Sequence, residues 1–536
     1  MSRARFVLLV CLCVSIPTLG AIDVGAGTTD DPAIEAVVPN PVADGNRGEY
    51  VVLNVPESTS LAGWTLTDGT HTVQLPNRTV QGRVVLSQSP AVTELLVSGP
   101  VYGWEGHLRL AADGDELVLR DPSGNDVDAF VYHSTSQGDA WHRENGTVKS
   151  SVTGDTAFAF DRHGSVNMTA FVLPDAPDTP TRALERAEDR IWLAGYELSE
   201  PDVVATLLER HAAGVDVRVL VDGRPVGGQA EPEVVALDML VEAGIPVRVI
   251  RGDRRRYRFH HPKYAIVDQT AIVLTENWKP SGTGGTSSRG WGVTATDREL
   301  ADDLAAVFLA DHTWRDTVAW ERFRHEANPQ PVNTSVRVYP EANEPAHINA
   351  DAVRLVVAPD NAESVLLDVI DAAETSIDVQ QVRISDIDFP LLEALIDAAS
   401  RGVTVRIHLD STWYVATEND ELAERLIERA ADDDLPLSVR LVEPGVRFEK
   451  IHTKGMIVDE EVVVIGSLNW NNVSMRENRE ILLVIEDASV GAYYTEIFEG
   501  DWRSRASVTP IGLVLIALMA WVSAATIASR RVTFAE

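Results

Sequence analysis

Residues 452–459 read His-Thr-Lys-Gly-Met-Ile-Val-Asp, and residues 261–268 read His-Pro-Lys-Tyr-Ala-Ile-Val-Asp. In both stretches the apolar run between the lysine and the aspartate is typical of a short buried strand. On an extended strand a histidine and a lysine two positions apart point to the same face, so both can reach one ligand. The repeated stretch therefore predicts two copies of one domain, each of which presents an imidazole and an ammonium group.

The sequence around these stretches repeats as well. Ala187 corresponds to Ala373 and Gly214 corresponds to Gly402, which gives a period near 190 residues. This period is too long for a solenoid and indicates a duplicated domain. In both regions apolar strands alternate with amphipathic helices, which indicates an α/β fold. We predict α/β domains over residues 181–324 and 353–505 that form a pseudo-dimer, with a Pro-rich linker over residues 325–352.

Residues 33–132 have a different pattern. Short segments such as Glu49 to Asn54 alternate apolar and polar residues and are separated by Gly, Asn and Asp-Gly, which predicts a small all-β sandwich. The strings Val38-Pro39-Asn40-Pro41, Leu61-Ala62-Gly63-Trp64 and Asp121-Pro122-Ser123-Gly124-Asn125 resemble the lamin-tail domain. That resemblance implies an immunoglobulin-like module that binds an unknown ligand or acts as a spacer.

The charge of the chain restricts its partners. Among 536 residues, 46 are basic and 81 are acidic, and only five of the basic residues are lysine. An acidic, lysine-poor surface is typical of adaptation to molar salt, where the Debye length falls to about 3 Å. We therefore expect a salt-loving, archaeal source, and we exclude a dedicated sequence-specific DNA-binding protein. The only cysteines are Cys11 and Cys13, so we expect a mature chain without disulfides or thiolate metal sites.

Both ends of the chain carry apolar segments. Arg3 and Arg5 precede an uncharged run that ends at Leu19, which predicts a signal peptide over residues 1–20, with a retained anchor as the alternative. Residues 510–528 carry no charge, and as a helix they would span about 28 Å, enough to cross a bilayer. We expect a single-pass cell-membrane protein whose body is extracellular, and sequons such as those at Asn77 and Asn167 suit a glycoprotein.

The motif pair resembles the phospholipase D superfamily, whose signature is HxKxxxxD followed by GSxN. In this chain Gly466-Ser467-Leu468-Asn469 follows the second HxKxxxxD stretch. The resemblance implies a phosphodiesterase or phosphatidyltransferase in which one imidazole attacks phosphorus and forms a phosphohistidine. The other imidazole protonates the leaving oxygen and later activates water, and this scheme requires no metal or other cofactor.

The predicted site residues follow from these motifs. The predicted catalytic residues are His261, Lys263, His452, Lys454 and Glu480, and the predicted phosphate-binding residues are Thr275, Asn277, Ser467 and Asn469. The lysines and the amide and hydroxyl groups would stabilise charge on the nonbridging oxygens. Asp268 and Asp459 are expected to brace the turns that follow the motif strands rather than to react.

The first copy departs from the pattern, because it has Leu274-Thr275-Glu276-Asn277 where the second has Gly466-Ser467-Leu468-Asn469. By the resemblance Glu480 is expected to hold His452 through a hydrogen bond, whereas residues 277–296 of the first copy contain no carboxylate. We therefore predict unequal halves, with His452 as the general acid and base and His261 as the nucleophile. The sequence leaves open whether Glu276 obstructs the cleft.

The sequence also leaves the substrate open. The arginine-rich run at residues 251–258 can gather phosphate groups or can form a solvated loop of paired arginines. Residue 510 follows closely after the second domain and favours phospholipid, whereas the lamin-tail-like module is a companion of exported nucleases. A non-catalytic phosphate-binding surface protein is the third reading, and the altered first motif supports it.

Overall fold

The structure is a computed structural model. It describes residues 31–503 apart from residues 42–47, 95, 98, 145, 153, 155, 251–255, 333–336, 386, 443–444 and 446. The predicted signal peptide at residues 1–20 and the predicted membrane span at residues 510–528 lie outside the described residues. Within the described part of the chain, no helix is both long enough and apolar enough to cross a membrane.

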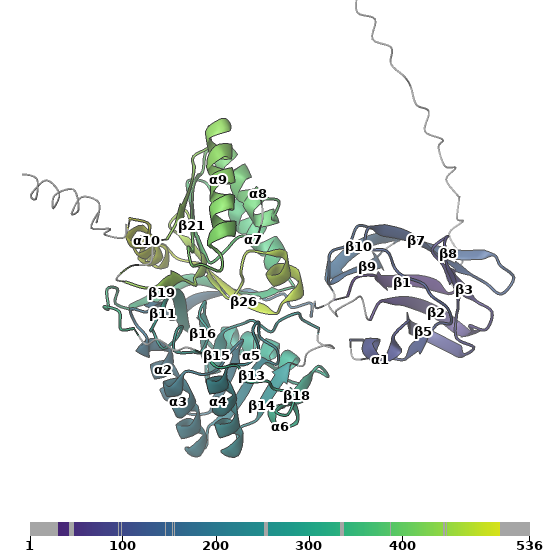
Figure 1. Cartoon of the computed structure of the whole chain (residues 1–536), viewed down its shortest axis with the longest axis horizontal. Coiled ribbons are helices and arrows are strands. Elements are labelled where there is room, and N and C mark those ends of the chain that lie inside the picture. The colour runs from purple at the N-terminus through teal and green to yellow at the C-terminus, as the bar shows by residue number, and fades with distance from the viewer. Residues whose placement is uncertain are drawn as a thin grey trace, which may run out of the picture.

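The N-terminal region is an all-β unit of two packed sheets, seen on the right of Figure 1. The six-stranded sheet has the order β10 (Thr147–Val152), β9 (Asp139–Glu144), β1 (Ala33–Val38), β2 (Tyr50–Ser60), β5 (Thr79–Ser87), β6 (Val101–Gly103). The four-stranded sheet has the order β4 (Thr72–Gln74), β3 (Thr65–Thr67), β7 (Gly114–Arg120), β8 (Asp126–His133), and a short helix α1 (Pro90–Thr93) follows β5. Val51 and Leu53 of the first sheet share one core with Leu117 and Phe130 of the second, so the two sheets form a sandwich.

The rest of the chain forms one 16-stranded mixed sheet that both copies share. From one edge to its centre the strands are β18 (Thr317–Ala319), β14 (Val247–Ile250), β13 (Asp216–Asp222), β12 (Arg190–Gly195), β15 (Tyr264–Val267), β16 (Thr270–Leu274), β17 (Ser288–Thr296) and β11 (Arg162–Leu173). From the centre to the other edge they are β19 (Ala346–Ala358), β26 (Glu480–Glu486), β25 (Val462–Gly466), β24 (Lys454–Val458), β20 (Ser376–Gln381), β21 (Thr404–Leu409) and β22 (Leu437–Leu441), and β23 (Lys450–Ile451) pairs with β17. This arrangement confirms the prediction of tandem α/β domains.

The two halves of the sheet are related across the antiparallel pair β11 and β19. Both central strands begin before the predicted domain boundaries at residues 181 and 353. Their first halves alternate polar residues such as Asn167 and Asn349 with apolar residues, because they lie side by side at the centre of the sheet with one face toward solvent.

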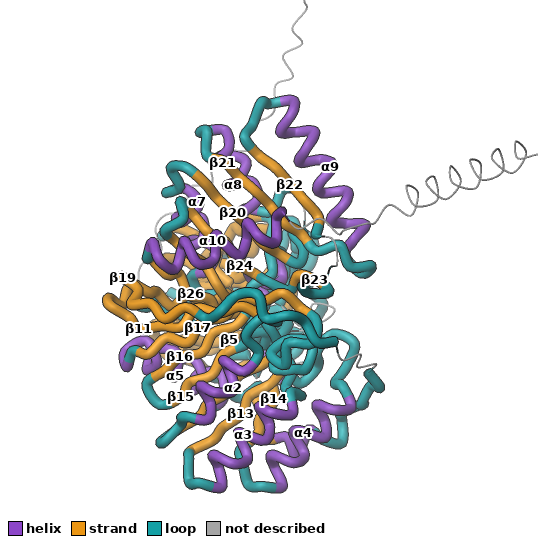
Figure 2. Tube along the Cα trace, turned by 90° about the vertical axis from the view of Figure 1, so that its left-hand side faces the viewer, coloured by secondary structure: helices purple, strands orange, loops and turns teal. Residues whose placement is uncertain are grey.

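Helices cover each half of the sheet. The first copy carries α2 (Asp178–Glu185), α3 (Pro201–Ala212), α4 (Glu231–Glu242), α5 (Arg298–His312) and α6 (Trp320–Phe323). The second copy carries α7 (Ala362–Asp371), α8 (Pro390–Ser400), α9 (Ala416–Asp432), the short π-helix η3 (Val473–Glu477) and α10 (Ala488–Arg503). Figure 2 shows the strands in the middle of the molecule, with α7, α8 and α9 on one outer side and α3 and α4 on the other.

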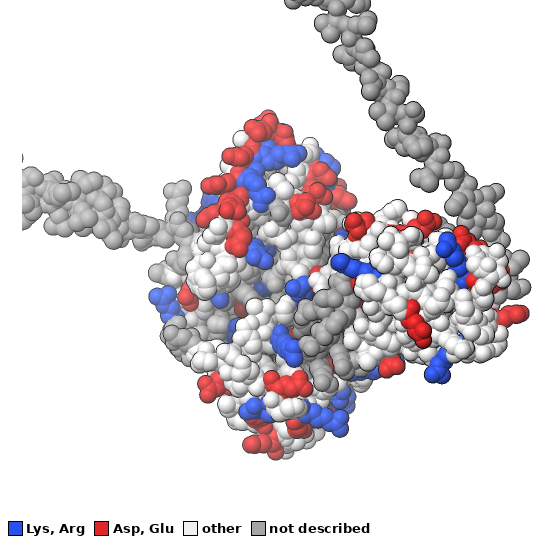
Figure 3. All heavy atoms as spheres, turned by 45° about the vertical axis from the view of Figure 1, so that its right-hand side comes forward, with Lys and Arg blue, Asp and Glu red and all other residues white. Residues whose placement is uncertain are grey.

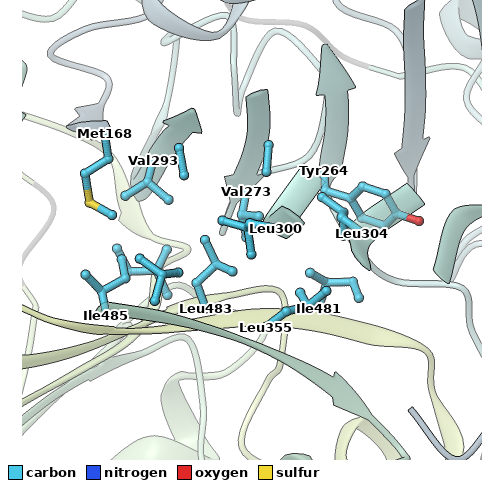
Figure 4. Packing of buried hydrophobic residues seen from close by; sticks show 14 of the residues in the cluster. Met168, Tyr264, Val273, Val293, Leu300, Leu304, Leu355, Ile481, Leu483 and Ile485 are labelled. Atoms are coloured by element: carbon cyan, nitrogen blue, oxygen red, sulfur yellow. The ribbon is translucent and has the colours of Figure 1, made fainter. Parts of the chain in front are cut away.

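A hydrophobic core joins the two copies face to face. One cluster contains Val273 and Val293 of the first copy together with Leu355 and Leu483 of the second. Figure 4 shows these side chains pointing toward one another from opposite layers. The outer face of each half packs separately against its own helices. Helices α5 and α10 instead pack in the joint core between the two halves. Burial of this joint core fixes the two motif strands relative to each other.

Candidate active site

The two motif stretches lie at the boundary between the copies. The backbone N–H of His261 donates to the carbonyl of Arg479 at 3.0 Å, and that of His452 donates to the carbonyl of Arg289 at 2.9 Å. Lys454 Nζ also lies 3.4 Å from the carbonyl oxygen of Thr275 in the first copy. Each motif is therefore hydrogen-bonded to the opposite copy, and the boundary brings both motifs into one site.

His261 is held by Glu480 of the second copy. Its Nδ1 lies 2.9 Å from Glu480 Oε2 and 3.0 Å from Oε1, and Asn478 Nδ2 donates to the same carboxylate at 2.9 Å. Glu480 is fully buried, which disfavours its charge, but His261 and then Lys263 hold the pKa of Glu480 below its ordinary value. A carboxylate at Nδ1 places the Nδ1 proton toward Glu480 and leaves Nε2 free to react.

Burial lowers the pKa of His261 to about 4, with Glu480 opposing the shift and Lys263 adding to it. The ring is therefore neutral at physiological pH. Its side chain keeps 11% of its surface exposed, so a substrate can reach it. A neutral, oriented imidazole with an open Nε2 has the properties of a nucleophile.

The prediction that Glu480 holds His452 is wrong, because His452 faces Glu276 of the first copy. His452 Nδ1 lies 3.1 Å from Glu276 Oε2, and the His452 side chain is 20% exposed. The carbonyls of Arg289 in β17 and of Arg479, just before β26, each accept the N–H of the motif histidine of the opposite copy, and each histidine takes its carboxylate from that opposite copy. Glu276 lies against the Nδ1 side of the ring, at the opposite end from the Nε2 that would react.

Burial shifts the pKa values of this second pair. It raises the pKa of Glu276 to about 7, although Lys454 and Lys450 oppose the shift. Burial and then Lys454 hold the pKa of His452 well below its ordinary value. A carboxylate 3.1 Å from Nδ1 can stabilise the imidazolium that forms when Nε2 takes a proton, as a general acid and base requires.

The two motif lysines point into the same buried region. Lys263 Nζ donates to the carbonyl of His261 and lies 5.4 Å from the centre of the Tyr196 ring. Lys454 Nζ donates to the carbonyl of His452 at 2.6 Å. Burial lowers the pKa of Lys454 to about 7 and that of Lys263 well below its ordinary value. An anionic phosphodiester between them would favour their charged forms.

The predicted phosphate-binding hydroxyls make backbone contacts. Thr275 Oγ1 accepts the N–H of Trp291 at 2.9 Å, and Ser467 Oγ accepts the N–H of Ile481 at 3.0 Å. These matched contacts establish that Thr275 and Ser467 are structural equivalents. Contact of either hydroxyl with phosphate stays a prediction.

The two predicted asparagines follow those hydroxyls at the end of the adjoining strands. Asn277 is buried, and its Oδ1 has no hydrogen-bond partner among the described residues. Asn469 is half-buried. Their binding of phosphate also stays a prediction.

Asp268 and Asp459 brace turns, as predicted. The carboxylate of Asp268 accepts the backbone N–H groups of residues 188, 189 and 190 at 2.8–2.9 Å. The carboxylate of Asp459 accepts those of residues 374, 375 and 376 at 2.7–2.9 Å. Each aspartate thereby ties the end of its motif strand to the start of the neighbouring antiparallel strand, β12 in the first copy and β20 in the second.

Two buried arginines are part of the site framework and were missed from the sequence. Arg289 lies 3.2 Å from Asp175 and 2.9 Å from Asp501. Its carbonyl accepts the His452 N–H, so the ion pairs fix the strand that holds His452.

Arg479 has the equivalent role for His261. It lies 2.9 Å from both Asp360 and Asp311. The signal was present in the sequence, because Leu173-Pro174-Asp175 and Ala358-Pro359-Asp360 recur with nearly the same period as the motifs.

The described part of the arginine-rich run is paired with protein groups. Arg256 contacts Asp311 and Asp316, and Arg258 contacts Glu477 at 3.1 Å. Residues 251–255 lie outside the described residues. For the described arginines, the interpretation as paired arginines is confirmed.

Comparison with known proteins places this geometry in a family. The model of the family described as "Cardiolipin synthase, PLD-like domain" matches residues 181–314 and 366–502, which together are about half of the chain. The two matched segments correspond to the two copies.

Individual relatives carry related names. A "Phospholipase D" of Rickettsia bellii is 32% identical over 149 residues, which cover 27% of this chain and 65% of that protein. "Cardiolipin synthase A" of Cronobacter sakazakii is 35% identical over 119 residues, 22% of each chain. The phosphatidylserine synthase structure of Haemophilus influenzae aligns with a TM-score of 0.49 and 13% identity over 63% of this chain and 88% of its own. The match spans less than two thirds of either curated relative.

Proposed function

The chain belongs to the phospholipase D-like family, and from this premise we propose that it cleaves or transfers phosphodiesters through a covalent phosphohistidine. One observation carries the proposal: two histidines from the two copies each have a carboxylate of the opposite copy at Nδ1. This pairing leaves Nε2 of both rings available for chemistry on a shared phosphate.

We assign the nucleophile to His261. Its Nε2 attacks phosphorus, the P–N bond forms, and the bond from phosphorus to the leaving oxygen breaks as protonated His452 gives that oxygen its Nε2 proton. The anionic phosphodiester in the site favours that protonated form. His452 then takes a proton from water or an alcohol, whose oxygen attacks phosphorus and breaks the P–N bond. The hydrogen bonds to an ionised Glu480 support this assignment, because they stabilise the positive charge on the attacking ring.

We propose a phospholipid substrate. The names of the curated relatives support this class, and so does the rim of the site. Trp413 is 89% exposed and Tyr414 is 41% exposed, and Lys450, two residues before His452, has its Nζ 5.6 Å from the Tyr414 ring. An exposed aromatic pair beside a lysine suits the headgroup level of a bilayer.

The rim of the first copy carries a matching feature. Val226 is 76% exposed on the loop after β13, as Trp413 is on the loop after β21. The N–H of Val226 donates to the hydroxyl of Tyr196, whose ring centre lies 4.7 Å from that of His261. Apolar side chains on both sides of the site would let it approach a lipid surface.

We propose membrane attachment through residues 510–528, with the catalytic body outside the cell. Helix α10 ends at Arg503, and Asp501 near its end contacts Arg289, whose carbonyl accepts the His452 N–H. The chain therefore leaves the folded body close to the site. Acidic side chains gather over the outer end of the second copy, around α9, which suits the salt-loving source that we propose (Figure 3).

We propose that the N-terminal sandwich is a lamin-tail-like binding or spacer module. Arg315 of the first copy donates to the carbonyls of Glu94 and Val97, and Arg258 donates to Gln137 at 3.1 Å. These contacts would hold the module beside the catalytic copies.

The test offers three substrates to the purified chain in molar salt: bis(p-nitrophenyl) phosphate, vesicles of archaeal-type phospholipid, and plasmid DNA. We expect p-nitrophenol release that His452→Ala abolishes, together with headgroup release from vesicles. Cleavage of DNA alone would make the protein a nuclease. Phosphate binding without turnover of any substrate would identify it as a non-catalytic surface protein.

A further inference from the structure

We infer that Glu276 positions His452. Its carboxylate takes, in the first copy, the role that the Glu480 carboxylate has in the second. The inference rests on the proposed function and adds a residue that lies outside the repeated motif. It also explains why a glutamate follows Thr275 where the second copy has Leu468.

Strand register shows which residue of the first copy corresponds to Glu480. Leu274 of β16 pairs with Gly292 of β17, and Gly466 of β25 pairs with Leu482 of β26. Two residues before Leu482 stands Glu480, and two residues before Gly292 stands Gly290. The first copy therefore has no side chain at the position from which the second copy supplies its carboxylate.

The Glu276 side chain occupies the space that Gly290 leaves free. A Cβ atom added to Gly290 would lie 2.2 Å from Glu276 Cγ and 2.9 Å from its Cδ, closer than real Cβ contacts allow. A Cβ atom added to Gly282 would lie 2.9 Å from Glu276 Oε2. Two glycines thus make room for a carboxylate that enters from the adjoining strand end.

The equivalent residue of the second copy has a different role. Leu468 corresponds to Glu276, is fully buried, and packs in the outer core of its copy. Glu276 is 1% exposed, yet it points to the site, where its Oε2 lies 3.1 Å from His452 Nδ1. A buried charged group is costly unless it has a partner, so this contact accounts for the presence of the glutamate.

The contact has a specific chemical consequence. A carboxylate opposite Nδ1 keeps the ring in the tautomer whose Nε2 faces the substrate, and it stabilises the imidazolium that forms when Nε2 takes a proton. Glu480 has Asn478 as a second partner, whereas Glu276 Oε1 has no hydrogen-bond partner among the described residues. The approach of Oε2 to within 3.1 Å of His452 Nδ1 is therefore the contact through which Glu276 can act on the ring.

The test uses Glu276→Gln, which keeps the shape of the side chain and removes its charge. With bis(p-nitrophenyl) phosphate we expect a first burst of p-nitrophenol to persist, because this leaving group departs without a proton. Steady turnover, which needs His452 as a base, should fall about 10–100-fold. The acid limb of the steady rate, below which His452 is protonated and cannot act as a base, should move to lower pH, because loss of the carboxylate disfavours protonated His452.

An exchange variant separates positioning from a merely structural role. Glu276→Leu alone should lose steady turnover, and Glu276→Leu combined with Gly290→Glu should restore both the rate and the pH profile. Glu200→Gln is the matched control, because burial also raises the pKa of Glu200 to about 7. Among the described residues, Glu200 makes no hydrogen bond or ion pair with either motif histidine. The control should leave the rate within about two-fold.

Two outcomes would overturn the inference. One is a Glu276→Gln chain that is folded, as judged by circular dichroism, and unchanged in steady rate and pH profile. The other is an exchange variant no faster than Glu276→Leu. Absence of turnover in the unaltered chain would instead overturn the proposed function.

Discussion

Nδ1 of His261 lies 2.9 Å from Oε2 of Glu480, although 219 positions separate the two residues and they belong to opposite copies. In the contact between His452 and Glu276 the copies exchange roles: the second copy supplies the histidine and the first copy supplies the carboxylate. Each of the two motif histidines thus has its carboxylate in the opposite copy. The joint core and the buried arginines therefore support catalysis, because they hold each histidine beside the carboxylate of the opposite copy.

The pH dependence of Glu480→Gln tests the first pair. His261 must be neutral to attack, so kcat/KM should rise as pH increases through about 4, the value to which burial lowers the pKa of His261. Glu480 raises that pKa, so its loss should move the acid limb to lower pH. Loss of the oriented tautomer should lower kcat/KM about 10–100-fold.

The measurement is kcat/KM against pH for bis(p-nitrophenyl) phosphate, over the acidic range in which circular dichroism shows a folded chain. Glu477→Gln is the matched control, since Glu477 is a nearby buried glutamate that pairs with Arg258. An acid limb at the same pH in Glu480→Gln and the unaltered chain would contradict the account.

Asp459→Ala should lower stability and spare the chemistry. The carboxylate accepts three backbone N–H groups, and its loss should lower the free energy of unfolding by about 1–3 kcal/mol. Burial disfavours the charge of Asp459, but these hydrogen bonds outweigh it and hold its pKa below 3.8. Its stabilisation is thus present above pH 3.8 and is lost as pH falls through the lower folded-state pKa.

Urea unfolding and rate measurements on the folded fraction check this prediction, with Asp268→Ala as the equivalent change in the first copy. A large loss of rate in fully folded Asp459→Ala would mean that the aspartate takes part in the reaction.

Arg479→Met tests the framework behind His261. Removing the guanidinium leaves Asp360 buried without its arginine and Asp311 with Arg256 as its remaining arginine, so the free energy of unfolding should fall by about 3–5 kcal/mol. Asp360→Asn in the same chain should recover part of this loss. The midpoint of urea unfolding measures both effects, and a double variant no more stable than the single one would contradict the pairing.

Trp413→Ala tests the lipid surface. If Trp413 enters the headgroup region, burying its ring contributes roughly 1.5–3 kcal/mol, so vesicle binding should weaken at least about ten-fold. Turnover of bis(p-nitrophenyl) phosphate should stay within about two-fold. Val338→Ala, which alters another exposed side chain but lies in the linker, is the control. Equal effects of both variants on vesicle binding would remove this support for a lipid substrate.

Much of the framework could be predicted from the sequence, because it depends on local pattern. The spacing of His452, Lys454 and Asp459 identified a strand and a turn, and the structure has both. The period near 190 residues predicted two copies, and they share one sheet.

The carboxylate pairing could not be predicted, because it depends on which strands meet at the boundary between copies. Sequence reasoning paired Glu480 with the histidine nearer in sequence, whereas strand pairing brings it to His261. The sequence prediction sought a carboxylate of the first copy among the residues after Asn277. The carboxylate that contacts His452 belongs to Glu276, which lies just past the end of β16. Gly290 was the signal in the sequence that could have indicated this contact. It stands where the second copy has Glu480, and a glycine at that position leaves room for the side chain of another residue.

The central claim is that one histidine attacks and the other handles protons, and trapping the intermediate tests it most directly. His452→Asn is mixed with bis(p-nitrophenyl) phosphate, quenched with alkali, digested, and searched by mass spectrometry for a peptide that carries a p-nitrophenyl phosphoryl group, since one ester stays on phosphorus. The account predicts a burst of about one p-nitrophenol per chain and the p-nitrophenyl phosphoryl group on His261, with no burst from His261→Asn. The same group on His452 in the His261→Asn chain, or a burst without any phosphohistidine, would contradict it.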